Sequence, residues 1–143
     1  MRIVLDTAIL VRATEGSNGP ARQLLLHIVT GSDTLLLCNE ILFEVAKVLR
    51  YPRMLALHGL SENRIYEFIC FLPEASELVA LDSLLSVPIR DENDIIVVQT
   101  AMIGDADVIC PPGAPLRSIP LPRCAVIEGV ASLRAHLAGT VIM

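Results

Sequence analysis

Three acidic residues from separate parts of the chain have the type and placement of ligands for a hard metal ion. Asp6 follows an aliphatic run, Glu44 borders the apolar face of an expected helix, and Asp94 precedes a second aliphatic run. A buried carboxylate costs several kcal/mol unless it is paired or protonated. Mg²⁺ is commonly held by a couple of carboxylates together with water and substrate phosphate. Such an ion activates water and stabilises charge at a scissile phosphodiester, so the acids are compatible with metal-assisted hydrolysis.

The same acids also have structural explanations. Asp6 could accept backbone N–H groups in a turn after a strand, and Glu44 could be a solvated residue at the edge of its helix. Glu40 lies in a first helical turn, where it complements the helix dipole. Asp91 and Asp94 have the spacing of a capping box, which explains Asp91 as a cap better than Asp94, because the third residue of that motif is normally Glu or Gln.

The elements that must position these acids alternate between strand and helix. The expected strands are residues 2–5, 35–37, 78–81, 108–110 and 125–127. The expected helices are 20–29, one capped by Asn39 and ended at Tyr51-Pro52, one capped by Ser61 and running to about Phe71, 92–103, and 130–137. Strands separated by helical stretches predict an α/β fold with a central parallel sheet, in one domain over residues 1–143. Asp6 then lies at the carboxyl end of the first strand, where such sheets gather their ligands.

Composition narrows the class of protein. The chain is 53% hydrophobic with only 3% aromatic residues and a mean hydropathy of +0.60, which suits aliphatic strands covered on both faces. No apolar run approaches the roughly 20 residues that cross a bilayer, and the first aliphatic stretch is too short for a signal peptide. We therefore expect a cytoplasmic protein without a membrane segment. A net charge of −5 does not favour an electrostatic nucleic-acid binder, although a few arginines beside an acidic metal site remain compatible with one.

The remaining residues that could do chemistry give weaker signals. Glycine-rich phosphate loops are absent from the sequence, and Ala8 excludes a DxD start. The three histidines have no carboxylate or thiol arranged around them and are expected on surfaces or helix faces. The four cysteines lack zinc-site spacing and are expected to be buried free thiols: Cys38, Cys70, Cys110 and Cys124.

Taken in order, three segments of the chain resemble the PIN domain family of metal-dependent ribonucleases. RIVLDTAIL resembles the opening block of a hydrophobic run followed by D-T-N. LLLCNEILFEVAKVLRYPRM resembles the second block, a strand followed by a helix that carries the second acid. RDENDIIVVQTAMIGDADVI resembles the third block, which carries two further aspartates. The resemblance extends over essentially the whole chain.

The resemblance implies a three-layer α/β/α fold around a parallel sheet and a Mg²⁺- or Mn²⁺-dependent endoribonuclease. By this likeness the catalytic and metal-binding acids are Asp6, Glu44 and Asp94, with Asp91 as an accessory metal ligand, whereas Glu40 does not match the motif. It also implies RNA as substrate and a toxin–antitoxin context. Together with the aliphatic excess, it makes an antitoxin partner and a homodimer reasonable expectations.

Two departures from the family pattern keep other hypotheses open. Ala8 stands where the family usually has Asn, and Pro111 and Gly113 stand where Thr and a further Asp are expected. Fewer carboxylates lower the affinity for a cation. The first alternative is therefore a PIN domain that has lost cleavage and acts as an RNA- or protein-binding module. A second is an unrelated doubly wound domain that binds a small ligand.

Overall fold

Five parallel strands form one sheet in the order β3-β2-β1-β4-β5. The computed structural model describes residues 1–14, 19–81, 92–111, 124–127 and 129–142, and only the backbone of residues 92–94 and 139–142. The strands are β1 (Arg2–Leu5), β2 (Thr34–Leu37), β3 (Ser76–Leu78), β4 (Val108–Cys110) and β5 (Ala125–Val126). Four of these match the expected strands closely, whereas β3 overlaps the strand expected at 78–81 only at Leu78, and residues 79–81 are not in a strand.

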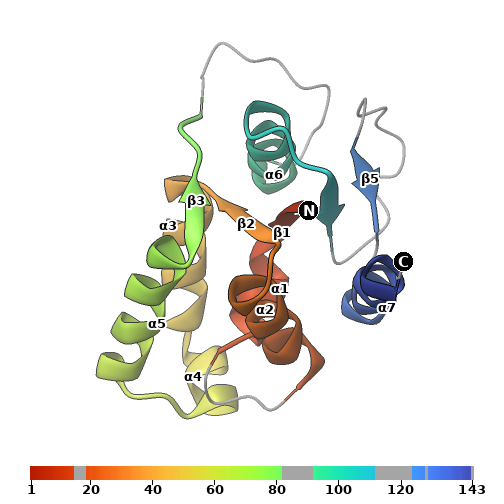
Figure 1. Ribbon diagram of the computed structural model, residues 1–143. Coiled ribbons are helices and arrows are strands. Elements are labelled where there is room, and N and C mark those ends of the chain that lie inside the picture. The colour runs from red at the N-terminus through yellow and green to blue at the C-terminus, as the bar shows by residue number, and fades with distance from the viewer. Residues whose placement is uncertain (15–18, 82–91, 112–123, 128, 143) are drawn as a thin grey trace.

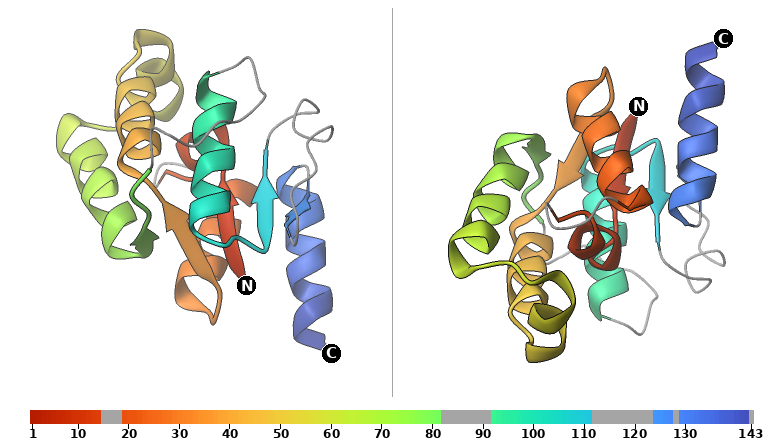
Figure 2. Two further views of the ribbon diagram at one scale, coloured as in Figure 1. Left: turned by 90° about the horizontal axis from the view of Figure 1, so that it is seen from above. Right: turned by 90° about the horizontal axis from the view of Figure 1, so that it is seen from below.

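Helices cover both faces of this sheet. They are α1 (Thr7–Arg12), α2 (Pro20–Thr30), α3 (Asn39–Leu49), α4 (Pro52–His58), α5 (Glu62–Glu74), α6 (Glu92–Ile103) and α7 (Val130–Ile142). Helix α6 packs on β1, β2 and β4, and α2 lies against the opposite face with α7 beside it (Figures 1 and 2). Helices α3 and α5 pack together near the β3 edge (Figure 1). The expected three-layer α/β/α fold around a parallel sheet is confirmed.

The centre of the sheet is aliphatic and closed to water. Ile3, Val4 and Leu5 of β1 are buried, as are the three leucines of β2 and all of β4. Strand β1 pairs in parallel with β2 on one side and with β4 on the other, so both neighbours present aliphatic side chains to it. Strands buried on both faces read as continuous apolar runs, which explains the unusually aliphatic composition.

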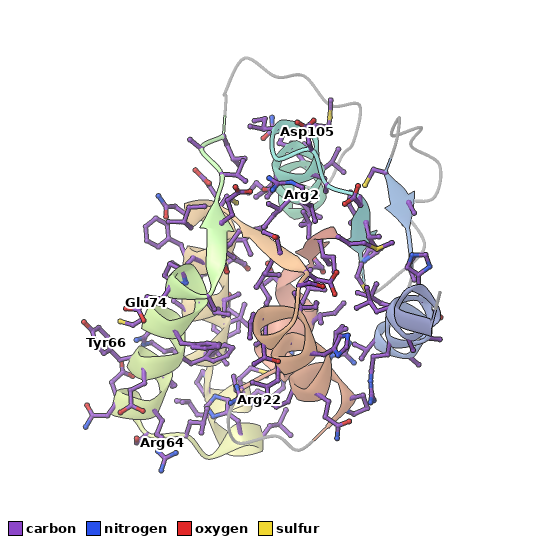
Figure 3. The ribbon with its side chains drawn as sticks, viewed as in Figure 1. Arg2, Arg22, Arg64, Tyr66, Glu74 and Asp105 are labelled. Atoms are coloured by element: carbon purple, nitrogen blue, oxygen red, sulfur yellow. The ribbon has the colours of Figure 1, made fainter. Side chains whose placement is uncertain are left out.

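Polar contacts from Arg2 hold the amino-terminal edge of the sheet together. Its Nε donates to the carbonyl of Gly104 at 2.9 Å, its guanidinium pairs with Glu77, and its backbone N–H donates to Asp107 Oδ2 at 2.8 Å. Arg2 thus connects the first strand with β3 and with the turn between α6 and β4, which also carries Asp105 (Figure 3). The carboxyl end of α6 is therefore anchored at this edge.

Two short helices were not predicted from the sequence. Helix α1 spans six residues directly after the first strand, and its short aliphatic run after Thr7 is too brief to show a helical period. Helix α4 begins at Pro52, which was read only as the end of the preceding helix. Proline at a first helical position suits a new helix, because its missing N–H would be unbonded there anyway.

Several expected helix ends also differ from the structure. Cys38, not Asn39, is the N-cap of α3, and its sulfur accepts the Ile41 N–H at 3.4 Å. Ser61 does cap α5, as expected, but α5 continues past Phe71 and includes Pro73 in its last turn, at the cost of the backbone hydrogen bond that a proline cannot donate. Helix α7 extends beyond its expected end to Ile142. The prediction of four buried thiols is confirmed for Cys38 and Cys110, but Cys70 is exposed on α5 and Cys124 is only half-buried.

No helix in the described part of the chain combines the length and the apolar character that crossing a bilayer requires.

A substitution at Gly104 tests how closely the end of α6 packs against the sheet. A Cβ atom there would lie 2.9 Å from Leu36 Cδ1 and 2.9 Å from the Thr100 carbonyl oxygen. We therefore expect Gly104→Ala to lower the free energy of unfolding by about 1–3 kcal/mol, measured by urea denaturation. The matched control is Gly59→Asn, because Gly59 has a φ of 62° with open space around it, and Asn tolerates that conformation. Equal stability of Gly104→Ala and the wild type would contradict this packing.

Candidate active site at the carboxyl edge of the sheet

Asp6 occupies the point where the first strand becomes a helix. Its backbone N–H donates to the carbonyl of Cys110 at 3.1 Å, and its own carbonyl accepts the N–H groups of Ile9 and Leu10 at 3.0 and 3.1 Å. The residue is half-buried and is the N-cap of α1, but its side chain does not cap that helix, whose residues are all described. These hydrogen bonds hold the backbone of Asp6 through both its N–H and its carbonyl, so the position from which its carboxylate extends is fixed as well.

The topology brings the elements that carry the other acids to the same edge. Helix α6 ends next to Arg2 at the amino edge and leads into β4, so its first turn lies toward the carboxyl edge. Helix α3 starts directly after the carboxyl end of β2. Helix α3 contacts both α1 and α6, and α6 contacts β1. The elements bearing Asp6, Glu44 and Asp94 are therefore mutual neighbours.

The structure describes the individual acids to different extents. The side chain of Glu44 is half-buried on α3, consistent with its place beside the apolar residues Val45 and Val48. Asp94 lies in the first turn of α6, but its side chain falls outside the described part of the structure. Asp91 and Gly113 lie outside the described residues altogether. Among the described side chains, no group of three or more His, Cys, Asp and Glu residues gathers as a metal site.

A buried polar contact fixes α6 against the start of α3. The hydroxyl of Thr100 lies 2.7 Å from the carbonyl oxygen of Ile96 and 3.2 Å from the sulfur of Cys38. Both Thr100 and Cys38 are buried, and burial raises the pKa of the Cys38 thiol. The thiol therefore serves as a neutral cap and packing group. This contact sets the direction of the two helices on which the second and third acids are carried.

Cys110 lies beside Asp6 and was not recognised as part of the site. Its sulfur donates to the Gly129 carbonyl at 3.6 Å, and burial raises the pKa of its thiol to about 11. Arg12 lowers that pKa and Asp6 raises it, so both charged groups act on the same buried sulfur. The sequence signal that could have revealed this neighbour is the position of Cys110 at the end of the strand expected at 108–110, which the structure pairs with the end of β1.

The two departures from the family pattern fall at this edge. Ala8 is exposed in the first turn of α1, two residues after Asp6, so an asparagine side chain would meet no steric barrier from the core. Pro111 follows the end of β4 and is buried, and its carbonyl accepts the Gly129 N–H at 3.4 Å. Pro111, which stands where the family pattern has a polar residue, therefore links the end of β4 to the start of α7 through this hydrogen bond.

The parallel sheet order, the half-buried acid at the end of the central strand and the flanking helices define a three-layer α/β/α domain with a candidate site at the carboxyl edge of its sheet. A sequence profile described as a PIN domain matches residues 2–111. The chain therefore belongs to the PIN domain family. The comparison with curated proteins found no match.

A solved structure with a similar fold is VapBC2 from Rickettsia felis bound to a DNA fragment from their promoter. The match has a TM-score of 0.61 at 13% sequence identity, and it covers 90% of this chain and 98% of the other. At this identity the similarity establishes the fold. It supports the three-layer architecture over nearly the whole length of the chain.

The Cys110 thiol predicts a specific dependence of stability on pH. Its pKa is about 11 in the folded protein and near 9.0 when exposed, so the unfolded state loses this proton first. The stabilisation is complete below pH 9 and is lost as the pH rises to 11, up to about 2.7 kcal/mol for two pKa units. Urea denaturation in EDTA at pH 8 and pH 10.5 should show a smaller loss for Cys110→Ala than for the wild type. Parallel losses in both proteins would show that this thiol does not titrate as described.

Proposed function

We propose that the protein is a PIN-type endoribonuclease that depends on Mg²⁺ or Mn²⁺ and acts as the toxin of a toxin–antitoxin pair. Asp6, Glu44 and Asp94 are the proposed catalytic metal ligands, with Asp91 as an accessory ligand. The observation that carries the proposal is the position of Asp6, half-buried at the carboxyl end of the central strand, where the helices bearing Glu44 and Asp94 also meet.

The donors at this edge fit a hard divalent ion. Asp6 and Glu44 supply carboxylate oxygens, whereas the raised pKa of Cys110 keeps the nearby sulfur protonated and disfavours a softer thiolate-bound metal. When bound, such an ion supplies an activated water and stabilises negative charge at the phosphodiester. Asp6 contributes a carboxylate whose backbone is held by β4, and the aliphatic strand end behind it limits access of bulk water.

The proposal extends to the partners and the location of the protein. The structurally similar chain comes from a toxin–antitoxin complex, which supports an antitoxin as the protein partner of this chain. We further propose RNA as the substrate, a homodimer as the assembly, a cytoplasmic location, and one folded unit spanning residues 1–143. The aliphatic composition and several exposed apolar side chains, including Phe43 and Leu57, are consistent with protein contacts.

A second candidate function is a binding module without cleavage activity. Ala8 provides no polar group beside Asp6, and Pro111 has no backbone N–H to offer a phosphate. These two residues specifically favour weaker metal and substrate binding than an intact family site would have. Titration calorimetry with Mn²⁺ separates the candidates, since micromolar binding favours the enzyme and no binding at millimolar metal favours the module.

Replacement of Asp6 tests the proposed enzyme. We expect Asp6→Asn to abolish Mn²⁺-dependent cleavage of single-stranded RNA, because the amide removes the negative charge of the first ligand while keeping its shape. The cleavage rate, measured by gel electrophoresis of the RNA, should fall at least a hundredfold when such a ligand is removed. Glu40→Gln is the matched control on α3 and should cleave like the wild type. Cleavage that survives Asp6→Asn would exclude this active site.

Restoring the family residues tests the origin of any weak activity. The double variant Ala8→Asn with Gly113→Asp adds one amide and one carboxylate where the family pattern expects them. We expect it to bind Mn²⁺ at least tenfold more tightly in calorimetry and to cleave faster than the wild type. Unchanged metal affinity in a folded double variant would show that these two positions do not limit the site.

A further inference from the structure

A cavity of about 720 Å³ lies near the proposed active site, and none of the proposed metal ligands is among its described lining residues. It is bounded by the end of α1, the first turns of α2 and α7, and α4. Its walls are mainly apolar, with Val11, Met54 and Leu57 among them. Pockets that hold small ligands typically enclose about 300–1,000 Å³, so this one has room for a nucleotide-sized group.

Two polar side chains in the cavity lack partners within the described part of the chain. Arg12 is exposed and forms no hydrogen bond or ion pair with any described residue. The side chain of Thr14 also lines the cavity and is only 2% exposed, yet its hydroxyl has no hydrogen bond to a described residue. A buried hydroxyl without a partner is costly, and an oxyanion would satisfy it together with the guanidinium.

The electrostatic surroundings favour an anion. No acidic residue is among the described residues that line the cavity. The first turns of α2 and α7 both border it, and helix N-termini carry partial positive charge. These helix ends add to the charge of Arg12. The cavity therefore combines a cation, a buried hydroxyl and two positive helix ends over an apolar wall.

His58 contributes a ring surface and no free polar atom. Its Nδ1 accepts the N–H of Leu60 at 2.9 Å, and its Nε2 lies 2.9 Å from the Leu49 carbonyl, to which it donates. Both ring nitrogens are therefore used, which fixes the tautomer with the proton on Nε2. What remains for a ligand is the ring itself, beside Met54 and Leu57, a surface suited to the flat face of a nucleobase.

Two hydrogen bonds link the wall of the cavity to the strand end that carries Asp6. Asp6 donates its backbone N–H to the Cys110 carbonyl, and the Cys110 thiol donates to Gly129, which lines the cavity. Arg12 and Asp6 are six residues apart along α1, about 9 Å of helical rise. A polynucleotide whose scissile phosphate lay near Asp6 could therefore place a neighbouring nucleotide in the cavity.

We propose that this cavity binds a nucleotide of single-stranded RNA that flanks the cleaved bond. Arg12 and Thr14 hold its phosphate, and the base lies against the apolar wall with His58. The assignment of the flanking position rests on the proposed nuclease function. RNA is favoured over a peptide partner because Arg12 and the buried hydroxyl of Thr14 call for an oxyanion beside the flat ring of His58, and a nucleotide supplies both a phosphate and a flat base.

The test measures binding without cleavage. A fluorescein-labelled single-stranded RNA octamer is titrated with the full chain in EDTA, and fluorescence anisotropy reports Kd. We expect Arg12→Ala to raise Kd about tenfold, Thr14→Val to raise it about threefold, and Arg12→Lys to restore part of the affinity. Inorganic phosphate at millimolar concentration should compete with the RNA for the wild type and much less for Arg12→Ala.

Arg64→Ala is the matched control, because it removes the same charge from α5, away from the cavity, where Arg64 points outward (Figure 3). Its Kd should stay within twofold of the wild type. Circular dichroism confirms that each variant is folded. Equal affinities for Arg12→Ala, Thr14→Val and the wild type would overturn the proposal, and the cavity would then be open to a protein partner.

The same RNA, incubated with Mn²⁺, separates this inference from the nuclease proposal. Weaker binding by Arg12→Ala without cleavage by the wild type would support the cavity as an RNA site while the enzyme proposal fails. Cleavage by the wild type with unchanged binding by Arg12→Ala would support the enzyme and overturn the cavity as an RNA site.

Discussion

The hydrogen bond from the Asp6 N–H to the Cys110 carbonyl is the constraint on which the carboxyl edge depends. It is the last contact of the β1–β4 pair, and the Asp6 carbonyl immediately begins the bonding of α1. A single residue therefore ends the central strand, starts the first helix and presents a carboxylate. The surrounding layer of aliphatic side chains leaves that residue little alternative geometry, since packed interiors resist displacement.

The sequence predicted the strands and long helices of the fold better than the short helices and helix ends that connect them. Buried parallel strands read as continuous apolar runs and amphipathic helices as apolar faces, and β1, β2, β4 and α3 follow those patterns. Helix α1 has only six residues, too few for its aliphatic side chains to show a helical period. The cap of α3 was misassigned because polar N-caps are the usual choice, whereas the buried end of β2 places a cysteine there.

The sequence was sufficient to propose the individual residues of the candidate site, but not their arrangement in space. Asp6 could be placed because a strand end is visible in the sequence, and Glu44 because it borders an apolar helical face. Cys110 lies more than a hundred residues from Asp6 along the chain, and only the parallel register of β1 with β4 brings the two together. The polar lining of the cavity was missed for the same reason, because it is assembled from α1, α2, α4 and α7.

Because α6 is anchored at the amino edge, the contacts of Arg2 influence the position of the first turn of α6 at the opposite edge. A twelve-residue helix is about 18 Å long, so a tilt of about 10° at Gly104 would displace its first turn by about 3 Å. Metal ligands tolerate errors of only about 0.2 Å. The hydrogen bond from Arg2 to Gly104, at the opposite end of α6 from Asp94, would thereby help to set the accuracy of the proposed metal site, and selection on that site would also act on Arg2.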